Sequence, residues 1–446
     1  MSSVFISFLG TNNYMECRYS MNGTQSKLVK FVQEGIIQLI SHKFRDSEKD
    51  RVLIFLTDSA KEKNWNTSYG EEGLKGRIEK LGLPVELQTV KIPDGNSEEE
   101  IWDIFKILYE QFNEKDEVYL DVTHGFRSLP MLAMVLLNYA RFLKRIKVRG
   151  IYYGAFESLG TFEYVKERIQ PEGRIVPIFN LTAFHTLQMW SGAVENFEKL
   201  GDTNTISNLI YGSLNPFLQE SKGSDRKAVE ERDFAVGFNK IGNIFNTVRG
   251  RDLYEGKEHN KLKRQIEKVS NKGVYNYPLE PLIQKISEQV TPYKLNSLKN
   301  CYLGVQWCIK NGYIQQGITL LQETIISVIL DDIGEEWMNN EDGRKSREIE
   351  KKRKMVSSII KFYQIKDGDP SAKEPEDFSR NRSLVNSVLE SEAYEKLKNI
   401  FEKLRDYRNN INHAGFIRQI KPGTFENKLQ EAYKNAGVWF EHEGVG

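Results

Sequence analysis

The sequence predicts two kinds of structure in one chain, an α/β part built on a parallel sheet followed by an all-α part. In the first 180 residues, short β-rich apolar runs alternate with segments whose apolar residues recur at helical spacing. After about residue 177 the β-type runs become rare, and helical patterns joined by polar loops continue. The expected fold class is therefore α/β plus all-α.

Five apolar runs are expected to form the strands of the sheet, and four segments between them have helical periodicity. The strands are expected at residues 4–9, 52–56, 85–90, 118–122 and 148–153. The helices are expected at residues 28–40, 74–81, 101–112 and 129–142, with a capping box at Ser97 and Glu100 before the third. This alternation predicts parallel strands with helices on both faces and a ligand site at their carboxyl ends.

Composition and charge exclude several classes of function. The 446 residues include 63 Lys and Arg against 62 Asp and Glu, so contact with nucleic acid must come from local patches. Three cysteines argue against a disulfide framework and a cysteine-based zinc site, and we expect no metal. The first residues lack a basic signal region, and the longest apolar stretch is about half a membrane span. We therefore expect a cytoplasmic protein.

Polar residues gather where two of the predicted strands end. The fourth strand runs into Asp121-Val-Thr-His-Gly125-Phe-Arg127, and the first runs into Ser7-Phe-Leu-Gly10-Thr-Asn-Asn-Tyr14. Glycine permits close approach of the backbone, and the start of the following helix favours anions. These loops predict a polar, phosphate-tolerant cleft, with two ordinary strand-to-helix turns as the alternative. The chain lacks the glycine patterns of NAD and P-loop sites.

The Asp121-Val-Thr-His-Gly125 segment resembles the DxTHG motif of CARF domains, the CRISPR-associated Rossmann-fold sensors. The first-strand loop, from Ser7 to Thr11 with Tyr14 after it, is also similar to that family. The resemblance covers about residues 1–180 and implies a Rossmann-like domain that dimerises and binds a cyclic oligoadenylate across the two-fold axis. Cyclic tetra-adenylate is the expected activator, with cyclic hexa-adenylate next. The implied ligand-binding residues are Ser7, Leu9, Gly10, Thr11, Asn12, Tyr14, Asp121, Thr123, His124, Gly125, Phe126 and Arg127.

A second group of polar residues, Arg408-Asn-Asn-Ile-Asn-His413, ends a helical pattern near a plausible stop at Gly415. A histidine can transfer the protons of RNA cleavage near neutral pH. An arginine can hold the charged transition state with its planar fork of donors. Five residues apart, the two side chains lie about 140° apart on an ideal helix. Either the helix distorts there or two copies meet at a symmetric interface, and a purely structural pair is the alternative.

The Arg408-Asn409-x-x-x-His413 segment resembles the R-x4-6-H motif of HEPN ribonucleases. That family implies a composite site in a dimer, which cuts single-stranded RNA without metal and leaves a 2′,3′-cyclic phosphate and a 5′-hydroxyl. The resemblance implies that Arg408 binds the scissile phosphate, that His413 transfers a proton or orients the 2′-hydroxyl, and that Asn409 positions these groups. The expected domains are a sensor at 1–180, a helical middle region at 181–295 and a HEPN-like domain at 296–446.

The sequence therefore predicts a homodimeric endoribonuclease of the type III CRISPR response, activated by a cyclic oligoadenylate and without a membrane or DNA partner. Two alternatives remain open. One is a nucleotide-sensing regulator without catalysis, in which the Arg408–His413 segment is structural. The other is a sensor domain that also degrades its own ligand, with His124, Thr123 or Ser7 assisting the attack of a ribose 2′-hydroxyl.

Overall fold

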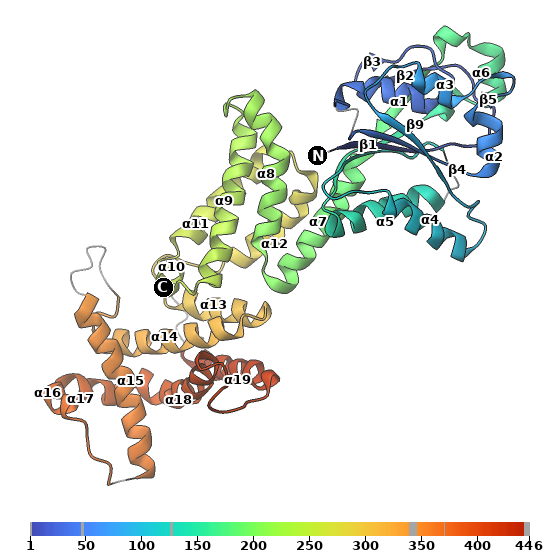
Figure 1. The fold of residues 1–446 in the computed structure, drawn as a ribbon. Helices are drawn as coiled ribbons and strands as arrows, with labels where there is room; N and C mark the ends of the chain where they lie inside the picture. Colours follow the sequence, from blue (N-terminus) through green and yellow to red (C-terminus); the bar gives the residue numbers. More distant parts are fainter. Residues whose placement is uncertain (1, 46–48, 125–127, 339–345, 370, 441–446) are drawn as a thin grey trace. The chain divides into compact units, whose positions relative to one another are not determined.

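The computed structural model describes residues 2–45, 49–124, 128–338, 346–369 and 371–440. They fold as two compact units, Met1–Met189 and Trp190–Gly446 (Figure 1). The first unit carries the described strands and the second is helical. The three-part division expected from the sequence, with a separate middle region, stays a prediction.

A sheet of eight strands forms the centre of the first unit, in the order β3-β2-β10-β9-β8-β1-β4-β7. All five predicted strands form and pair in parallel along the run from β9 to β7. They are β1 (Ser3–Phe8), β4 (Arg51–Leu56), β7 (Glu86–Lys91), β8 (Glu117–Asp121) and β9 (Lys147–Gly154). β1, β4 and β8 are buried along almost their whole length, which explains their nearly continuous apolar runs in the sequence.

The sheet as a whole is mixed rather than parallel, because three strands that the sequence did not predict join the parallel five. They are β2 (Arg18–Met21), β3 (Thr24–Gln25) and β10 (Ile175–Asn180). β10 runs antiparallel to β9, and β3 runs antiparallel to β2. These strands are short and only partly buried, and β10 contains Pro177, which has no N–H to donate. A tiny separate hairpin joins β5 (Thr67–Ser68) to β6 (Glu71–Glu72).

Helices cover both faces of the sheet, as expected (Figure 1). One face packs against α1 (Val32–Ile40) and α3 (Leu74–Glu79), and the other against α4 (Glu98–Glu110) and α5 (Ser128–Leu143). The first helix starts at Val32 rather than at residue 28, because Val29 forms an extended bridge with Cys17. Short helices α2 (Asp58–Ala60) and α6 (Phe162–Arg168) complete the unit.

The strand order places a topological switch beside β1. From β1 the chain builds outward through β4 and β7, then returns to add β8 and β9 on the other side. The crossover after β1 passes through α1 on one face, whereas the crossover after β8 passes through α5 on the other. The loops that leave β1 and β8 therefore diverge, and such a point is where open α/β sheets hold ligands.

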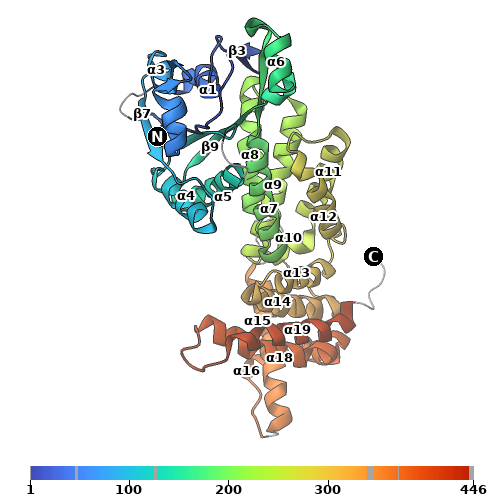
Figure 2. The same cartoon turned by 90° about the vertical axis from the view of Figure 1, so that its right-hand side faces the viewer.

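The C-terminal part of the second unit is built around a long buried helix, α14 (Ile314–Asp332), whereas α8, α9, α11 and α12 pack on one another. Figure 2 shows α13, α15, α18 and α19 gathered beside α14, and all four pack against it. The remaining bounds are α7 (Thr182–Leu200), α8 (Thr203–Glu220), α9 (Arg226–Asn246), α10 (Gly250–Glu255), α11 (Lys257–Lys272), α12 (Glu280–Val290), α13 (Lys299–Lys310), α15 (Ser346–Gly368), α16 (Glu376–Arg380), α17 (Arg382–Glu390), α18 (Glu392–Asn412) and α19 (Pro422–Phe440).

A buried histidine makes the helical unit sensitive to acid. His259 is fully buried, and within the described chain neither ring nitrogen has a hydrogen-bond partner. Its ring stacks on Tyr293 with the centroids 3.9 Å apart. Burial lowers the pKa of His259 to about 3, so the ring is neutral in the folded protein at physiological pH.

Acidification is therefore expected to destabilise the helical unit through His259. An unfolded histidine has a pKa of about 6.5, so below that pH the unfolded chain binds a proton that the folded chain refuses. Stability should fall by about 1.4 kcal/mol per pH unit down to the folded pKa. The drop in melting temperature from about pH 7.5 to about pH 5.5 should be smaller in His259→Phe than in the wild type. Exposed His42→Gln should keep the wild-type drop, and equal drops in all three proteins would contradict this account.

Candidate functional site

The loops that follow β1 and β8 line two cavities at the carboxyl edge of the sheet. One has a volume of about 470 Å³ and the other about 270 Å³. Both cavities are bordered by Asn12 and Tyr14 from the first loop and by Thr123 and His124 from the second. Of the other residues implied for ligand binding, the smaller cavity is also lined by Leu9, Gly10 and Thr11.

A pair of rings borders both cavities. The ring of Tyr14 lies 4.7 Å from that of His124 and 5.4 Å from that of Phe31, measured between centroids. Burial lowers the pKa of His124 to about 4, so its imidazole is neutral and offers one donor and one acceptor. A Cβ atom at Gly10 would lie 2.5 Å from the Tyr14 hydroxyl, so only glycine lets this ring take its place.

Asp121 holds the loop together from inside the protein. Its side chain is fully buried and accepts hydrogen bonds from Ser7 Oγ at 2.7 Å and from the Thr123 backbone N–H at 2.9 Å and hydroxyl at 2.5 Å. Burial raises the pKa of this carboxyl, and the hydrogen bonds partly oppose that effect. Thr123 Oγ1 accepts in turn from the Gly154 N–H at 2.8 Å. Asp121 and Ser7 therefore position the loop and line neither cavity, in contrast to His124.

Gly125, Phe126 and Arg127 lie outside the described residues. Their roles in ligand binding stay predictions from the resemblance. Asp121 is the last residue of β8. The motif therefore begins at the end of a strand, as predicted from the sequence.

Several residues of this site give no signal in the sequence. Buried Asn64 donates hydrogen bonds to the backbone carbonyls of Gly10 and Asn12, both at 2.9 Å, and so fixes the first loop. Phe156, Phe162 and Tyr19 add aromatic surface to the larger cavity, and Met15 also lines it. They come from segments far apart in the chain, and only the fold brings them to one cavity.

The second candidate site lies at the end of α18. Arg408 is half-buried on the last turns of the helix, and Asn409 is exposed. His413 is the C-cap residue, and its backbone N–H donates to the Asn409 carbonyl at 3.0 Å. The helix thus stops at His413, and the chain continues in the left-handed conformation at Ala414 and Gly415. Within the described chain, the side chains of Arg408 and His413 share no hydrogen bond or ion pair, so one copy does not assemble them into a pair.

Glu323 on α14 connects Arg408 to the body of the helical unit. One of its carboxylate oxygens lies 3.6 Å from Arg408 Nη2, and the other accepts a hydrogen bond from Arg353 Nη2 at 2.7 Å. The carboxylate therefore sits between two guanidinium groups. Arg408 therefore has an acidic neighbour in the body of the unit, at ion-pair distance and partly exposed to solvent.

A match to a known family covers most of the first unit. Residues 4–157 match the family model described as the CARF domain of the CRISPR system endoribonuclease Csx1. This match supports a CARF domain at residues 4–157. The match includes β1, β8 and both strand-end loops, so the ring pair of Tyr14 and His124 lies inside this CARF domain.

A curated protein also matches beyond the CARF domain. The chain is 22% identical over 341 residues to the CRISPR-associated protein MJ1674 of Methanocaldococcus jannaschii. That alignment covers 76% of this chain but only 44% of the relative, so the chain spans less than half of that protein.

Among the helices that the structure describes, none combines the length and the apolar character needed to cross a membrane. No group of three or more His, Cys, Asp or Glu side chains in the described ranges is arranged to hold a metal ion.

Proposed function

We propose that this protein is an endoribonuclease of the type III CRISPR response that a cyclic oligoadenylate activates. In this proposal the ligand, with cyclic tetra-adenylate as the first candidate, binds between the CARF domains of a homodimer. Binding then shifts the HEPN-like parts to a state that cuts single-stranded RNA without a metal ion. The observation that carries the proposal is one chain that joins a CARF domain with open strand-end cavities to an Arg408–His413 segment at an exposed helix end.

Exposed apolar residues support the homodimer. Along α5, which follows the CARF motif, exposed apolar side chains recur at helical spacing and form one stripe: Met131, Val135, Tyr139 and Phe142. Phe416 and Ile417, just after His413, are 93% and 79% exposed. Large exposed apolar groups of this kind mark association surfaces. A second copy of the chain is the partner that would also complete a composite catalytic site.

The chemistry at the helix end needs only side chains. The imidazole of His413 removes the proton of a ribose 2′-hydroxyl, and the 2′-oxygen attacks the neighbouring phosphorus. Arg408 donates to the non-bridging oxygens as negative charge develops. The bond to the 5′-oxygen breaks, and a second imidazole in the dimer returns a proton to that oxygen. The products are a 2′,3′-cyclic phosphate and a 5′-hydroxyl.

The hydrogen bonds of the CARF loop weigh on the alternative in which the sensor degrades its ligand. The hydroxyl groups of Ser7 and Thr123 both donate to Asp121. Of the three residues considered for that reaction, His124 is the one whose side chain lines the cavities and makes no hydrogen bond to Asp121. Ligand degradation is therefore a second candidate that depends on His124 alone.

Cleavage of a labelled single-stranded RNA with and without cyclic tetra-adenylate tests the proposal. We expect cleavage to rise at least about tenfold with the ligand, to persist in a chelator and to leave 2′,3′-cyclic phosphate ends. Cyclic hexa-adenylate and linear tetra-adenylate serve as matched ligands. Equal cleavage with and without every ring size would contradict activation, and no cleavage under any condition would favour the non-catalytic regulator.

A further inference from the structure

One face of α15 carries a row of exposed basic side chains. Arg347, Lys351, Lys354 and Lys361 recur at helical spacing, so they share this face, and all four are exposed. We call this row the basic stripe. At 1.5 Å per residue it extends for about 21 Å along the helix. The position on this face between Lys354 and Lys361 is Ser358, which is also exposed and adds no acidic charge.

The charges of the basic stripe are available to a ligand. Among the residues that the structure describes, Arg347, Lys351 and Lys361 have no hydrogen-bond or ion-pair partner. Lys354 pairs with Glu350 one turn before it, and its side chain is 74% exposed. Exposed pairs of this kind contribute little, so a phosphate can replace the carboxylate. The stripe therefore favours an anionic partner with several charges in a row.

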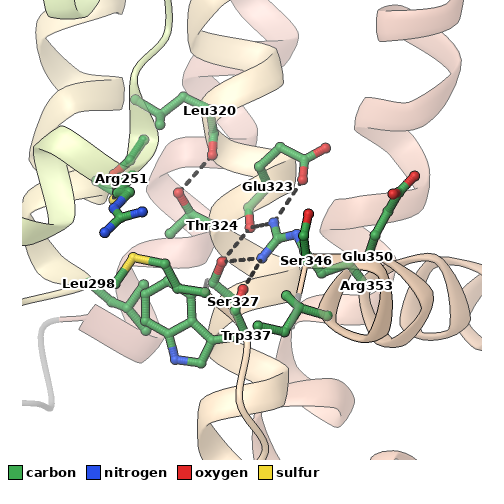
Figure 3. A pocket seen from close by; sticks show the side chains of 14 residues that line it. Arg251, Leu298, Leu320, Glu323, Thr324, Ser327, Trp337, Ser346, Glu350 and Arg353 are labelled. Atoms are coloured by element: carbon green, nitrogen blue, oxygen red, sulfur yellow. Dashed lines mark hydrogen bonds and ion pairs between the residues drawn. The ribbon is translucent and has the colours of Figure 1, made fainter. Parts of the chain in front are cut away.

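Contacts on the inner face of α15 fix the place of the helix. Figure 3 shows Arg353 reaching from α15 to α14, where it donates to Glu323 Oε2 at 2.7 Å. About three turns further along α15, Gln364 donates to Asn399 Oδ1 on α18 at 2.6 Å. α15 therefore lies across both α14 and α18. Because Glu323 also lies 3.6 Å from Arg408, this crossing is next to the candidate cleavage residues.

The flank of α15 that carries the basic stripe faces the C-terminal end of α18. α14 and α18 pack side by side and run antiparallel, because Asp332 at the end of α14 accepts a hydrogen bond from Ser391, the N-cap of α18, at 2.6 Å. Lys352 pairs with Glu335, just beyond that end of α14. Lys354 lies about 200° further around α15. The stripe therefore faces the opposite direction, toward the end of α18 that carries the candidate cleavage residues.

Lys361 connects the basic stripe to α18 itself. Glu402, Arg405 and Asn409 follow one another at helical spacing along one face of α18, and Glu402 pairs with Arg405. Burial raises the pKa of Glu402, and the positive charges of Arg405 and Lys361 oppose that effect, so Lys361 lies near this face. One turn further on, the same face reaches His413, the C-cap residue.

We propose that the basic stripe of α15 binds the phosphate backbone of the RNA substrate and leads the strand to the Arg408–His413 segment. Lysine and arginine side chains hold phosphates and position a strand without reading its bases. The inference rests on the proposed nuclease function and extends it, because it names the surface that holds the RNA on either side of the reacting bond. A chain with a net charge of only +1 needs such a local row of charges to bind RNA.

Removal of three charges tests the basic stripe in the full-length protein with saturating cyclic tetra-adenylate. Arg347→Gln/Lys351→Gln/Lys361→Gln should bind a short single-stranded RNA at least about tenfold more weakly at low salt. The slope of log affinity against log salt should become shallower by about 2, because each phosphate contact on a single strand contributes about 0.7. The labelled RNA carries 2′-O-methyl groups, so it cannot be cut through its 2′-oxygens, and its anisotropy reports binding alone. With unmodified RNA, KM should rise with little change in kcat.

The matched control removes three charges from another helix. Lys261, Arg264 and Lys268 are exposed on one face of α11 and have no ion-pair partner in the described ranges. Their triple glutamine variant should bind RNA like the wild type. Unchanged affinity in the α15 variant overturns the inference, and so do equal losses in both variants, which would show an effect of net charge alone. If unmodified RNA stays intact, the proposed nuclease function fails, while the anisotropy comparison still decides whether the stripe binds RNA.

Discussion

Alanine at His413 or at Arg408 is expected to lower ligand-activated RNA cleavage by about 10²- to 10⁴-fold, the usual contribution of a proton-transfer group or an electrostatic one. Without the imidazole, no positioned base removes the proton of the 2′-hydroxyl. Without the guanidinium, the charge on the phosphate has no planar donor. Initial rates on a labelled RNA at saturating cyclic tetra-adenylate measure both effects.

Two further variants make this prediction specific. Asn412→Ala changes an exposed side chain beside His413 and should leave the rate within about twofold, as for most surface substitutions. Arg408→Lys keeps the charge but not the planar fork, so it should recover only part of the activity. Near-normal cleavage by His413→Ala would show that the Arg408–His413 segment is structural. Unchanged melting temperatures would show that the losses are chemical.

Asp121→Ala is expected to unfold the loop that follows β8 and to abolish activation by the cyclic nucleotide. The substitution leaves the Thr123 hydroxyl and backbone N–H without their buried acceptor, and it leaves the Ser7 hydroxyl only the Phe8 carbonyl, 3.5 Å away. Each orphaned buried donor costs about 1–3 kcal/mol, so the CARF domain should lose about 3 kcal/mol or more of stability. Calorimetric titration with cyclic tetra-adenylate and thermal melting measure the two consequences.

The isosteric variant separates charge from hydrogen bonding. Asp121→Asn keeps one oxygen to accept from Thr123 and should retain most of the stability, because the Ser7 hydroxyl can turn to the Phe8 carbonyl, 3.5 Å away. Asp58→Asn, an exposed carboxyl at the end of β4, is the control and should behave like the wild type. Wild-type melting and ligand binding by Asp121→Ala would refute the positioning role of this carboxyl.

The sequence is a reliable guide to the parallel core of the sheet and a poor one to its edge. β1 and β4 are buried on both faces, so their apolar runs stand out from the surrounding residues. β2 and β10 are short and partly exposed, and Arg18 pairs with Ile175, a partner far away in the chain. No local pattern encodes such a pairing. The start of α1 was missed for a similar reason, the bridge between Cys17 and Val29.

For the candidate sites, the sequence locates the motifs but not the task of each residue within them. Asp121 turns inward while His124 borders the cavities, although both belong to one five-residue motif. Asn64 and Glu323 each act on a loop or helix that is remote in sequence, through a hydrogen bond or an ion pair. Nothing in the local sequence around an asparagine or a glutamate in a helical pattern indicates which remote residue it will bind.

The order of the strands has a consequence for how this domain can evolve. The crevice beside β1 arises because two crossovers diverge. The loop residues that line it can therefore be replaced without a change in any strand. Asn12, Asn13, Phe156 and Phe162 line the larger cavity from outside the sheet. A library randomised at these four positions, with Gly10 and Asp121 kept, is a direct route to sensors tuned to other cyclic nucleotides on the same scaffold.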